Sequence, residues 1–198
     1  MQYLKPEIRA KILSSALDEF AEHGYARAQM RRIAQGAGIS TSNIYRYFAG
    51  KEAIFAEIVR RVHEQVSALI ANVLKAEAAD GTNVQTAAQQ IADGIMTVYL
   101  DYGRELLVII DKSEGSKYAD FKDVLLQMLC QRIKKTIFNQ PSELDETVIY
   151  VLANGFLEGI FIIMRKEEDP QRIATLINRL VSFYFEKLEK RLVLSADT

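Results

Sequence analysis

The sequence predicts an all-α protein with nine helices. Apolar residues recur at helical spacing along nearly the whole chain, and no run alternates convincingly between apolar and polar residues as a half-buried strand would. The three prolines stand where helices would begin rather than in their interiors. The chain has 198 residues, of which 49% are hydrophobic and 26% charged, so a sizeable core is possible.

Three helices are predicted before Lys51, and the second and third of them are short. An amphipathic stripe follows Pro6, and Gly24 stands where a left-handed helix end is expected. A second helix is predicted from about Ala28 and is broken by the glycine-containing turn "GAGIS". Ser40 then has the side chain of a good N-cap for the third helix.

A much longer helix is predicted from Lys51. The fourth extends over about residues 51–76, and its apolar stripe is continuous. Neither a repeat nor a low-complexity linker interrupts the chain, so the fourth helix is expected to join an N-terminal domain, residues 1–52, to a second domain, residues 53–198. Five further helices are predicted at about 84–102, 104–112, 117–138, 142–165 and 170–191.

Charge is distributed unevenly along the chain. The formal net charge is -1, whereas residues 1–60 alone sum to +3 and the remainder to -4. The N-terminal segment therefore has the sign that phosphate prefers, although the whole chain does not.

Cysteine usage and hydropathy indicate the compartment. The single cysteine, Cys130, excludes an internal disulfide and is expected to be a packed thiol, with a redox role as the minor alternative. No signal peptide is recognisable, and no apolar run approaches the length needed to cross a bilayer. We expect a cytoplasmic protein that does not associate with a membrane.

The third helix would bury only Ile44 and Phe48. With Ile44 as the buried reference, Ser42 and Arg46 lie about 160° away on the outward face. Asn43 and Tyr45 lie on its flanks. Arginine pairs with guanine, asparagine with adenine, and serine or threonine with a base or a phosphate, so this face suits a DNA major groove. A helix, a glycine turn and a short second helix form the helix-turn-helix arrangement, in which the second helix contacts base edges.

The run "ILSSALDEFAEHGYARAQMRRIAQGAGISTSNIYRYFAGKEAIF" closely resembles the N-terminal DNA-binding segment of the TetR family of transcriptional repressors. The matching motifs lie at 20–25, 33–40, 44–48 and 51–55, and the resemblance covers roughly the first 60 residues. It implies that Tyr45 and Tyr47 hold phosphates and that Lys51 places its charge and a helix N-terminus against the DNA backbone. The residues that it implies face bases are Thr41, Ser42, Asn43 and Arg46.

The chain departs from the family pattern at two places. Ala28 and Gln29 replace the usual threonine pair that opens the second helix, so Gln29 or Arg27 would have to replace its phosphate contact. Ser42 stands where the family often has glycine, which changes the sequence that is bound rather than whether DNA is bound. Arg31 and Arg32 remain open between a phosphate role and a solvated face. The predicted DNA-binding residues are Gln29, Thr41, Ser42, Asn43, Tyr45, Arg46, Tyr47 and Lys51.

The last two predicted helices have apolar stripes wider than one neighbour needs. The family resemblance implies that they pair with their copies in a second subunit and form a four-helix interface. Ala153, Gly155 and Gly159 would let the backbones of the two subunits approach closely. A homodimer would place two reading helices on a palindromic operator in double-stranded DNA.

Aromatic residues, methionines and a few polar groups in the second domain are candidate ligand contacts, although such stripes are more often core. The resemblance implies that a bound effector tilts the fourth helix and releases the DNA. Because few charged residues lie within the pattern, we expect an apolar or aromatic small molecule. The predicted ligand-binding residues are Met96, Tyr99, Tyr102, Phe121, Met128, Asn154, Phe156 and Glu158.

The sequence favours a ligand-responsive dimeric transcriptional repressor. The alternative is a helical ligand-binding or scaffold protein whose N-terminal module no longer binds DNA, which the departure at Ala28 and Gln29 leaves open. No catalytic or dinucleotide motif is present, and His23 and His63 lack ligand partners at metal-binding spacing. We therefore expect neither an enzyme nor a bound cofactor.

Overall fold

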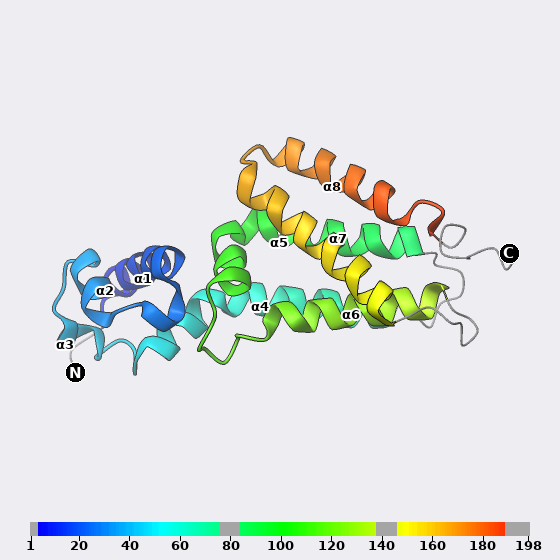
Figure 1. The fold of residues 1–198 in the computed structure, drawn as a ribbon. Helices are drawn as coiled ribbons and strands as arrows, with labels where there is room; N and C mark the ends of the chain where they lie inside the picture. Colours follow the sequence, from blue (N-terminus) through cyan, green and yellow to red (C-terminus); the bar gives the residue numbers. More distant parts are fainter. Residues whose placement is uncertain (1–3, 76–83, 138–145, 189–198) are drawn as a thin grey trace, which may run out of the picture. The chain divides into compact units, whose positions relative to one another are not determined.

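The computed structural model describes residues 4–75, 84–137 and 146–188, and these residues form helices without any strand (Figure 1). The all-α prediction is therefore confirmed over the described part of the chain. The helices are α1 (Pro6–Arg27), α2 (Met30–Gly36), α3 (Thr41–Ile44), α4 (Lys51–Lys75), α5 (Val84–Asp111), α6 (Phe121–Ile137), α7 (Glu146–Lys166) and α8 (Pro170–Phe185).

The described residues contain eight helices, so the predicted number of nine is wrong. The two helices predicted at 84–102 and 104–112 form one element, α5. A break does occur where the motif "DYGR" predicted it, because Tyr102 has φ -143° and ψ 42°, outside the helical region. The break is a kink, with helix continuing on both sides of Tyr102, rather than a loop.

Two helix ends also differ from the prediction. Helix α6 begins at Phe121 rather than 117, because the residues before it form successive turns that include Gly115 at φ 81°. Helix α8 ends at Phe185, after which Glu186 is extended and Lys187 has φ 53°. The predicted start of α7 at 142 and the predicted end of α8 at 191 lie outside the described residues.

The chain divides into two compact units. Within the described residues, the first unit comprises 4–65 and 101–121, and the second comprises 66–100 and 122–188. The divisions fall inside α4 and α5 and after the first residue of α6, so the chain passes from one unit to the other three times. The functional boundary predicted at residue 52 remains a prediction.

The first unit is built around aromatic side chains from α1 and α4. Phe20 and Phe55 are fully buried, and their ring centroids lie 4.9 Å apart in an edge-to-face arrangement. The Tyr25 ring lies 5.0 Å from Phe55. Ile33 from α2 and Ile44 from α3 complete the same core. Burial of these side chains fixes the short helices α2 and α3, which are too short to be stable alone.

Gly24 adopts a backbone conformation that other residues rarely adopt, with φ 73° and ψ 161°. An added Cβ would meet no atom closer than 3.7 Å, so the constraint is backbone strain rather than crowding. We expect Gly24→Ala to lower the free energy of unfolding by about 1–3 kcal/mol. Urea denaturation followed by circular dichroism measures this loss. Gly50→Ala is the control, because Gly50 has no positive φ and open space around it, and an equal loss in both variants would contradict the explanation.

Helices α7 and α8 pack closely in the second unit (Figure 1, yellow and orange). A Cβ added at Gly155 would lie 2.7 Å from the Tyr184 hydroxyl oxygen, and one at Gly159 would lie 2.8 Å from Leu180 Cδ2. The close approach that these glycines permit in this structure is therefore between two helices of the same chain. The sequence instead predicts a close approach between two subunits at these glycines.

By length and composition alone, α7 could cross a membrane, with a mean hydropathy of 1.9 over its most apolar window. The expectation that no run of this length exists is therefore wrong. Seven of its residues are nevertheless buried inside the protein, and Glu158 in its middle forms ion pairs with Lys122 and Arg165. Burial and internal ion pairs are typical of the core helix of a globular domain.

Candidate nucleic-acid interface

The third helix, α3, begins as the sequence predicts. Ser40 is extended, with φ -75° and ψ 151°, and its Oγ accepts a hydrogen bond from the Asn43 N–H at 3.2 Å. This bond satisfies one of the N–H groups that a helix start leaves without a partner. Ile44 is fully buried and Phe48 is 5% exposed, so the two predicted anchors are confirmed.

The surface of α3 and of the turn after it is polar. Ser42, Tyr45 and Arg46 are exposed, whereas Asn43 is partly buried. The Arg46 N–H donates to the Asn43 carbonyl, so the helical direction continues past the end of α3. This arrangement presents hydroxyl, amide and guanidinium groups together, as base recognition in a major groove requires.

Three further predicted DNA contacts come from the start of α2, from α3 and from the turn after α3. Thr41 and Tyr47 are partly buried, and the Tyr47 hydroxyl accepts a hydrogen bond from the backbone N–H of Lys5 at 3.3 Å. This bond ties the residue before α1 to the turn after α3. The side chain of Gln29 is exposed at the start of α2.

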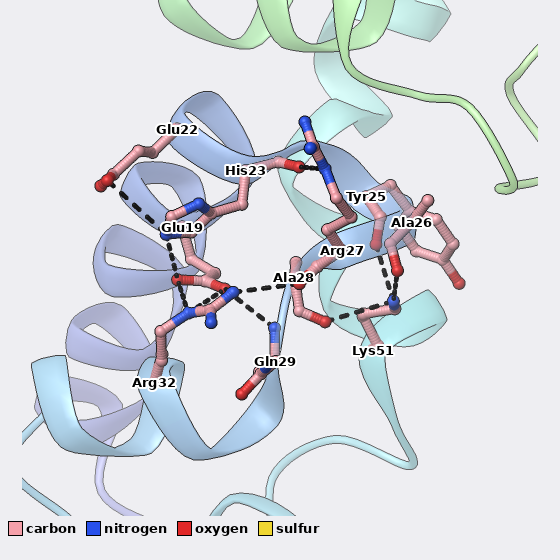
Figure 2. Close-up of polar contacts among 10 residues, drawn as sticks. All are labelled: Glu19, Glu22, His23, Tyr25, Ala26, Arg27, Ala28, Gln29, Arg32 and Lys51. Carbon is pink, nitrogen blue, oxygen red and sulfur yellow. Dashed lines mark hydrogen bonds and ion pairs between the residues drawn. The ribbon is translucent and has the colours of Figure 1, made fainter.

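The start of α2 is capped by a residue that its sequence position does not predict for this role. Gln29 is the N-cap, but its side chain makes no capping bond. Instead, the carboxylate of Glu19 on α1 accepts the Gln29 N–H at 2.8 Å (Figure 2). The missing threonine cap at Ala28 and Gln29 is thus replaced from another helix.

The same carboxylate holds Arg32. The Arg32 Nε donates to both oxygens of Glu19, at 2.8 and 2.9 Å, and its Nη2 donates to the Arg27 carbonyl at 3.0 Å (Figure 2). Arg32 therefore connects α2 to α1, whereas Arg31 is exposed. Of the two arginines left open by the sequence, Arg31 is the better placed for a phosphate.

Glu19 is only 7% exposed. Burial raises the pKa of its carboxyl. The hydrogen bonds from Arg32 and the Gln29 N–H, together with the charges of Arg32 and His23, lower this pKa by more than burial raises it, so the net shift is downward. His23 Nε2 lies 3.7 Å from Glu19 and 3.6 Å from Glu22. One signal in the sequence could have identified Glu19, because it follows Ala16 by three residues on the buried stripe of α1.

Lys51 has internal partners that the sequence did not predict. Its Nζ donates to the backbone carbonyls of Tyr25, Ala26 and Ala28 at 2.6, 3.2 and 3.3 Å (Figure 2). It also lies 4.5 Å from the centroid of the Tyr25 ring. The side chain thus closes the C-terminal end of α1. Its predicted contact with phosphate remains a prediction.

The eight predicted ligand-binding residues are divided between the two units. Tyr102 and Phe121 belong to the first unit and the other six to the second. Phe121, Met128 and Phe156 are buried, and the Phe156 ring packs 4.8 Å from Phe185. The Tyr99 hydroxyl donates to the Met164 carbonyl at 3.2 Å, whereas Met96 and Asn154 are partly buried. Their role in ligand binding remains a prediction.

A groove of about 500 Å³ lies between α6 and α7 in the second unit, and none of the eight predicted residues lines it. Cys130, Gln127 and Tyr150 are among the side chains around it. Burial raises the pKa of the Cys130 thiol, and the nearby charge of Lys134 offsets only part of this rise. The thiol is therefore protonated at neutral pH, which favours a packed cysteine over a reactive one.

Residues 12–58 match the family model described as bacterial regulatory proteins, tetR family. The chain is 26% identical to the uncharacterized HTH-type transcriptional regulator YdgC of Bacillus subtilis, over 88% of this chain and 91% of that protein. It is 27% identical to the HTH-type transcriptional repressor Rv1474c of Mycobacterium tuberculosis, over 86% and 89%. Both relatives are transcriptional regulators by name.

Two solved structures share the fold. A TetR-family transcriptional regulator from Bordetella parapertussis superposes with a TM-score of 0.65 at 18% identity, over 91% of this chain and 95% of that chain. The transcriptional regulator FadR from Bacillus subtilis, solved in complex with stearoyl-CoA, superposes with a TM-score of 0.54 at 16% identity, over 88% and 98%.

Proposed function

We infer that this chain belongs to the tetR family of bacterial regulatory proteins and is a DNA-binding transcriptional regulator. From this premise, we propose that it is a dimeric repressor that a small molecule releases from its operator. The observation that supports this most strongly is the polar surface of α3 on a buried support. Ser42 and Arg46 are exposed, while Ile44 and Phe48 are anchored in the core. DNA binding also requires access to the genome, so we propose a cytoplasmic location.

The proposed reading surface has two parts. Thr41, Ser42, Asn43 and Arg46 would contact base edges, and Tyr45 and Tyr47 would hold phosphates on either side. Gln29 would contact the backbone from the start of α2. The N–H groups in the first turn of α4, which begins at Lys51, would donate hydrogen bonds to the oxygens of a further phosphate.

A second copy of the chain is the proposed partner of α7 and α8. Val148, Val151 and Ile162 follow each other along α7 at helical spacing and are 40%, 61% and 44% exposed. Phe183 on α8 is 74% exposed. Apolar side chains exposed on two adjacent helices are typical of an unformed interface, and a symmetric pairing would cover both copies of the surface. The dimer would bind a palindromic operator with its two α3 helices.

An effector in the second unit would regulate this dimer. FadR from Bacillus subtilis was solved with stearoyl-CoA, whose acyl chain is apolar, and this supports an effector with a large apolar part but does not identify it. Helices α4 and α5 belong to both units, so they can transmit a change in the second unit to the first. An effector that favours the wrong spacing of the α3 helices by about 3 kcal/mol would weaken DNA binding roughly a hundredfold.

Selection of bound sequences from a random DNA pool tests the function. The expected result is a palindrome whose half-sites are about one helical turn apart, or a multiple of it. Candidate effectors are then added to the selected complex. Selection without any enriched sequence would favour the alternative, a ligand-binding or scaffold protein that has lost DNA binding. The Glu19 cap weakens that alternative, because α2 does not need the missing threonines.

We expect Arg46→Ala to relax the preference at one base pair in each half-site. The loss should be about 1–3 kcal/mol per contact, because the guanidinium pairs with a base edge. Fluorescence anisotropy with the selected operator and with single-base variants measures it. Arg61→Ala is the matched control, since Arg61 is an exposed arginine of α4 remote in sequence from α3. Equal losses on the operator and on random DNA would contradict base recognition by Arg46.

A further inference from the structure

The beginning of α1 contacts the turn that follows α3. The backbone N–H of Lys5, directly before α1, donates to the Tyr47 hydroxyl at 3.3 Å. The Arg9 guanidinium lies over the Phe48 ring, with its Cζ 5.1 Å from the ring centroid. The Arg9 N–H donates to the Lys5 carbonyl, so both contacts come from the first turn of α1. This turn therefore holds two consecutive residues that follow the reading helix.

Arg9 also binds α4. Its Nη1 and Nη2 each lie 3.2 Å from Oε1 of Glu57. The Arg9 side chain is 44% exposed and that of Glu57 is 32% exposed. An ion pair in such a position contributes little to stability by itself. Its main effect is to hold the guanidinium in one place, which is over the Phe48 ring.

Phe48 is linked directly to the last residue of α3. Its side chain is 5% exposed, and its N–H donates to the Ile44 carbonyl at 3.0 Å. The Tyr47 N–H donates to the same carbonyl at 2.8 Å. Helix α3 has only four residues and cannot hold its own direction, so its orientation depends on such contacts. A shift of Phe48 would therefore displace the reading surface.

We infer that Arg9 is a positioning residue for operator recognition, one that is held by Glu57 and fixes the direction of α3 through Phe48. This inference rests on the proposed function. Non-specific DNA binding depends on charge and tolerates small displacements, whereas contacts between side chains and base edges do not. Loss of the Arg9–Glu57 pair should therefore lower the ratio of operator affinity to random-DNA affinity.

Two variants separate positioning from a simple charge effect. Arg9→Met removes the guanidinium, and Glu57→Met removes the carboxylate that holds it. Loss of the Glu57 charge alone would raise the affinity for every DNA alike and would leave the ratio unchanged. A phosphate contact by Arg9 would contribute about -0.9 to the slope of log affinity against log salt concentration. Positioning instead predicts the same fall in the ratio from the loss of either partner.

Fluorescence anisotropy of the full-length wild type and of each variant measures binding to the selected operator and to random DNA, between about 50 and 200 mM salt. Circular dichroism at the binding temperature establishes that each variant is folded. We expect the ratio to fall about three- to fivefold in both variants, comparable to the strength of one partly exposed cation–π contact. The salt slope of Arg9→Met should be unchanged. The double variant should lose no more than the larger single loss, because the two residues act as a unit.

Lys11→Met is the matched control, because it removes an exposed cation from the same helix, two residues after Arg9. Its ratio should equal that of the wild type, and a fall as large as that of Arg9→Met would overturn the inference. A slope reduced by about 0.9 in Arg9→Met, or an unchanged ratio in either variant of the pair, would also overturn it. If Arg9→Met does not fold, the ratio in Glu57→Met decides.

Selection of bound sequences with the wild type comes before these measurements. Its failure overturns the proposed function and this inference together. A selected operator followed by a contrary result with the variants overturns the inference alone.

Discussion

Replacing Phe183 with glutamate is expected to convert the proposed dimer to a monomer at micromolar concentration. Phe183 is 74% exposed on α8, and the proposed interface would bury it. Burial of a phenylalanine side chain contributes about 1.5–3 kcal/mol, and a symmetric dimer contains two copies of each contact. Phe183→Glu should therefore weaken dimerisation by two orders of magnitude or more, since about 1.4 kcal/mol corresponds to tenfold.

Analytical ultracentrifugation of the wild type and of Phe183→Glu measures the effect. Val124→Glu is the matched control, because Val124 is an apolar residue on α6 that is 44% exposed but lies outside α7 and α8. The control should stay dimeric and bind the operator as the wild type does. The Phe183 variant should bind the operator weakly, because a monomer contacts one half-site. A dimer of unchanged strength in Phe183→Glu would place the interface elsewhere.

Glu19→Gln is expected to lower the free energy of unfolding by about 2 kcal/mol. The reason is that the buried Glu19 carboxylate, which accepts hydrogen bonds from the Arg32 guanidinium and from the Gln29 N–H, loses its charge. The substitution keeps the shape of the side chain and leaves an oxygen for the Gln29 N–H. It removes the ion pair with Arg32, which then lacks its carboxylate partner. The start of α2 should become less ordered, and operator affinity should fall with stability.

The pH dependence of this effect has a defined sign. The pKa of Glu19 is lower in the folded protein than its ordinary value of 4.5. A depressed carboxyl pKa contributes stability that is fully present above the unfolded value and is lost as the pH falls through the folded value. The stability difference between wild type and Glu19→Gln should therefore be constant at neutral pH and shrink below about pH 4.5.

Urea denaturation at several pH values measures this difference. Glu22→Gln is the matched control, because it makes the same charge change on the same helix at a side chain that is 77% exposed. Exposed charges contribute little, so this variant should have nearly wild-type stability. A Glu19→Gln variant as stable as Glu22→Gln at neutral pH would show that the Glu19 cluster is not needed to hold α2.

The sequence determined the elements whose signals are local. Helical spacing of apolar residues predicted all-α architecture, and Ser40, Ile44 and Phe48 specified how α3 begins and what it buries. These signals depend on residues within one or two turns of each other. The family motif around α3 is local in the same sense, which is why the match over residues 12–58 agrees with the prediction from its residues.

Only the tertiary structure decided which residues far apart in the sequence share a contact. Glu19 on α1 caps α2, and Lys51 on α4 donates hydrogen bonds to carbonyls at the end of α1. Gly155 and Gly159 on α7 allow α8 of the same chain to pack closely. Each of these partners was an ordinary charged or small residue when considered along the chain alone. A carboxylate or an ammonium can take any acceptor or donor that folding brings within reach, so its partner follows from packing and cannot be deduced from spacing.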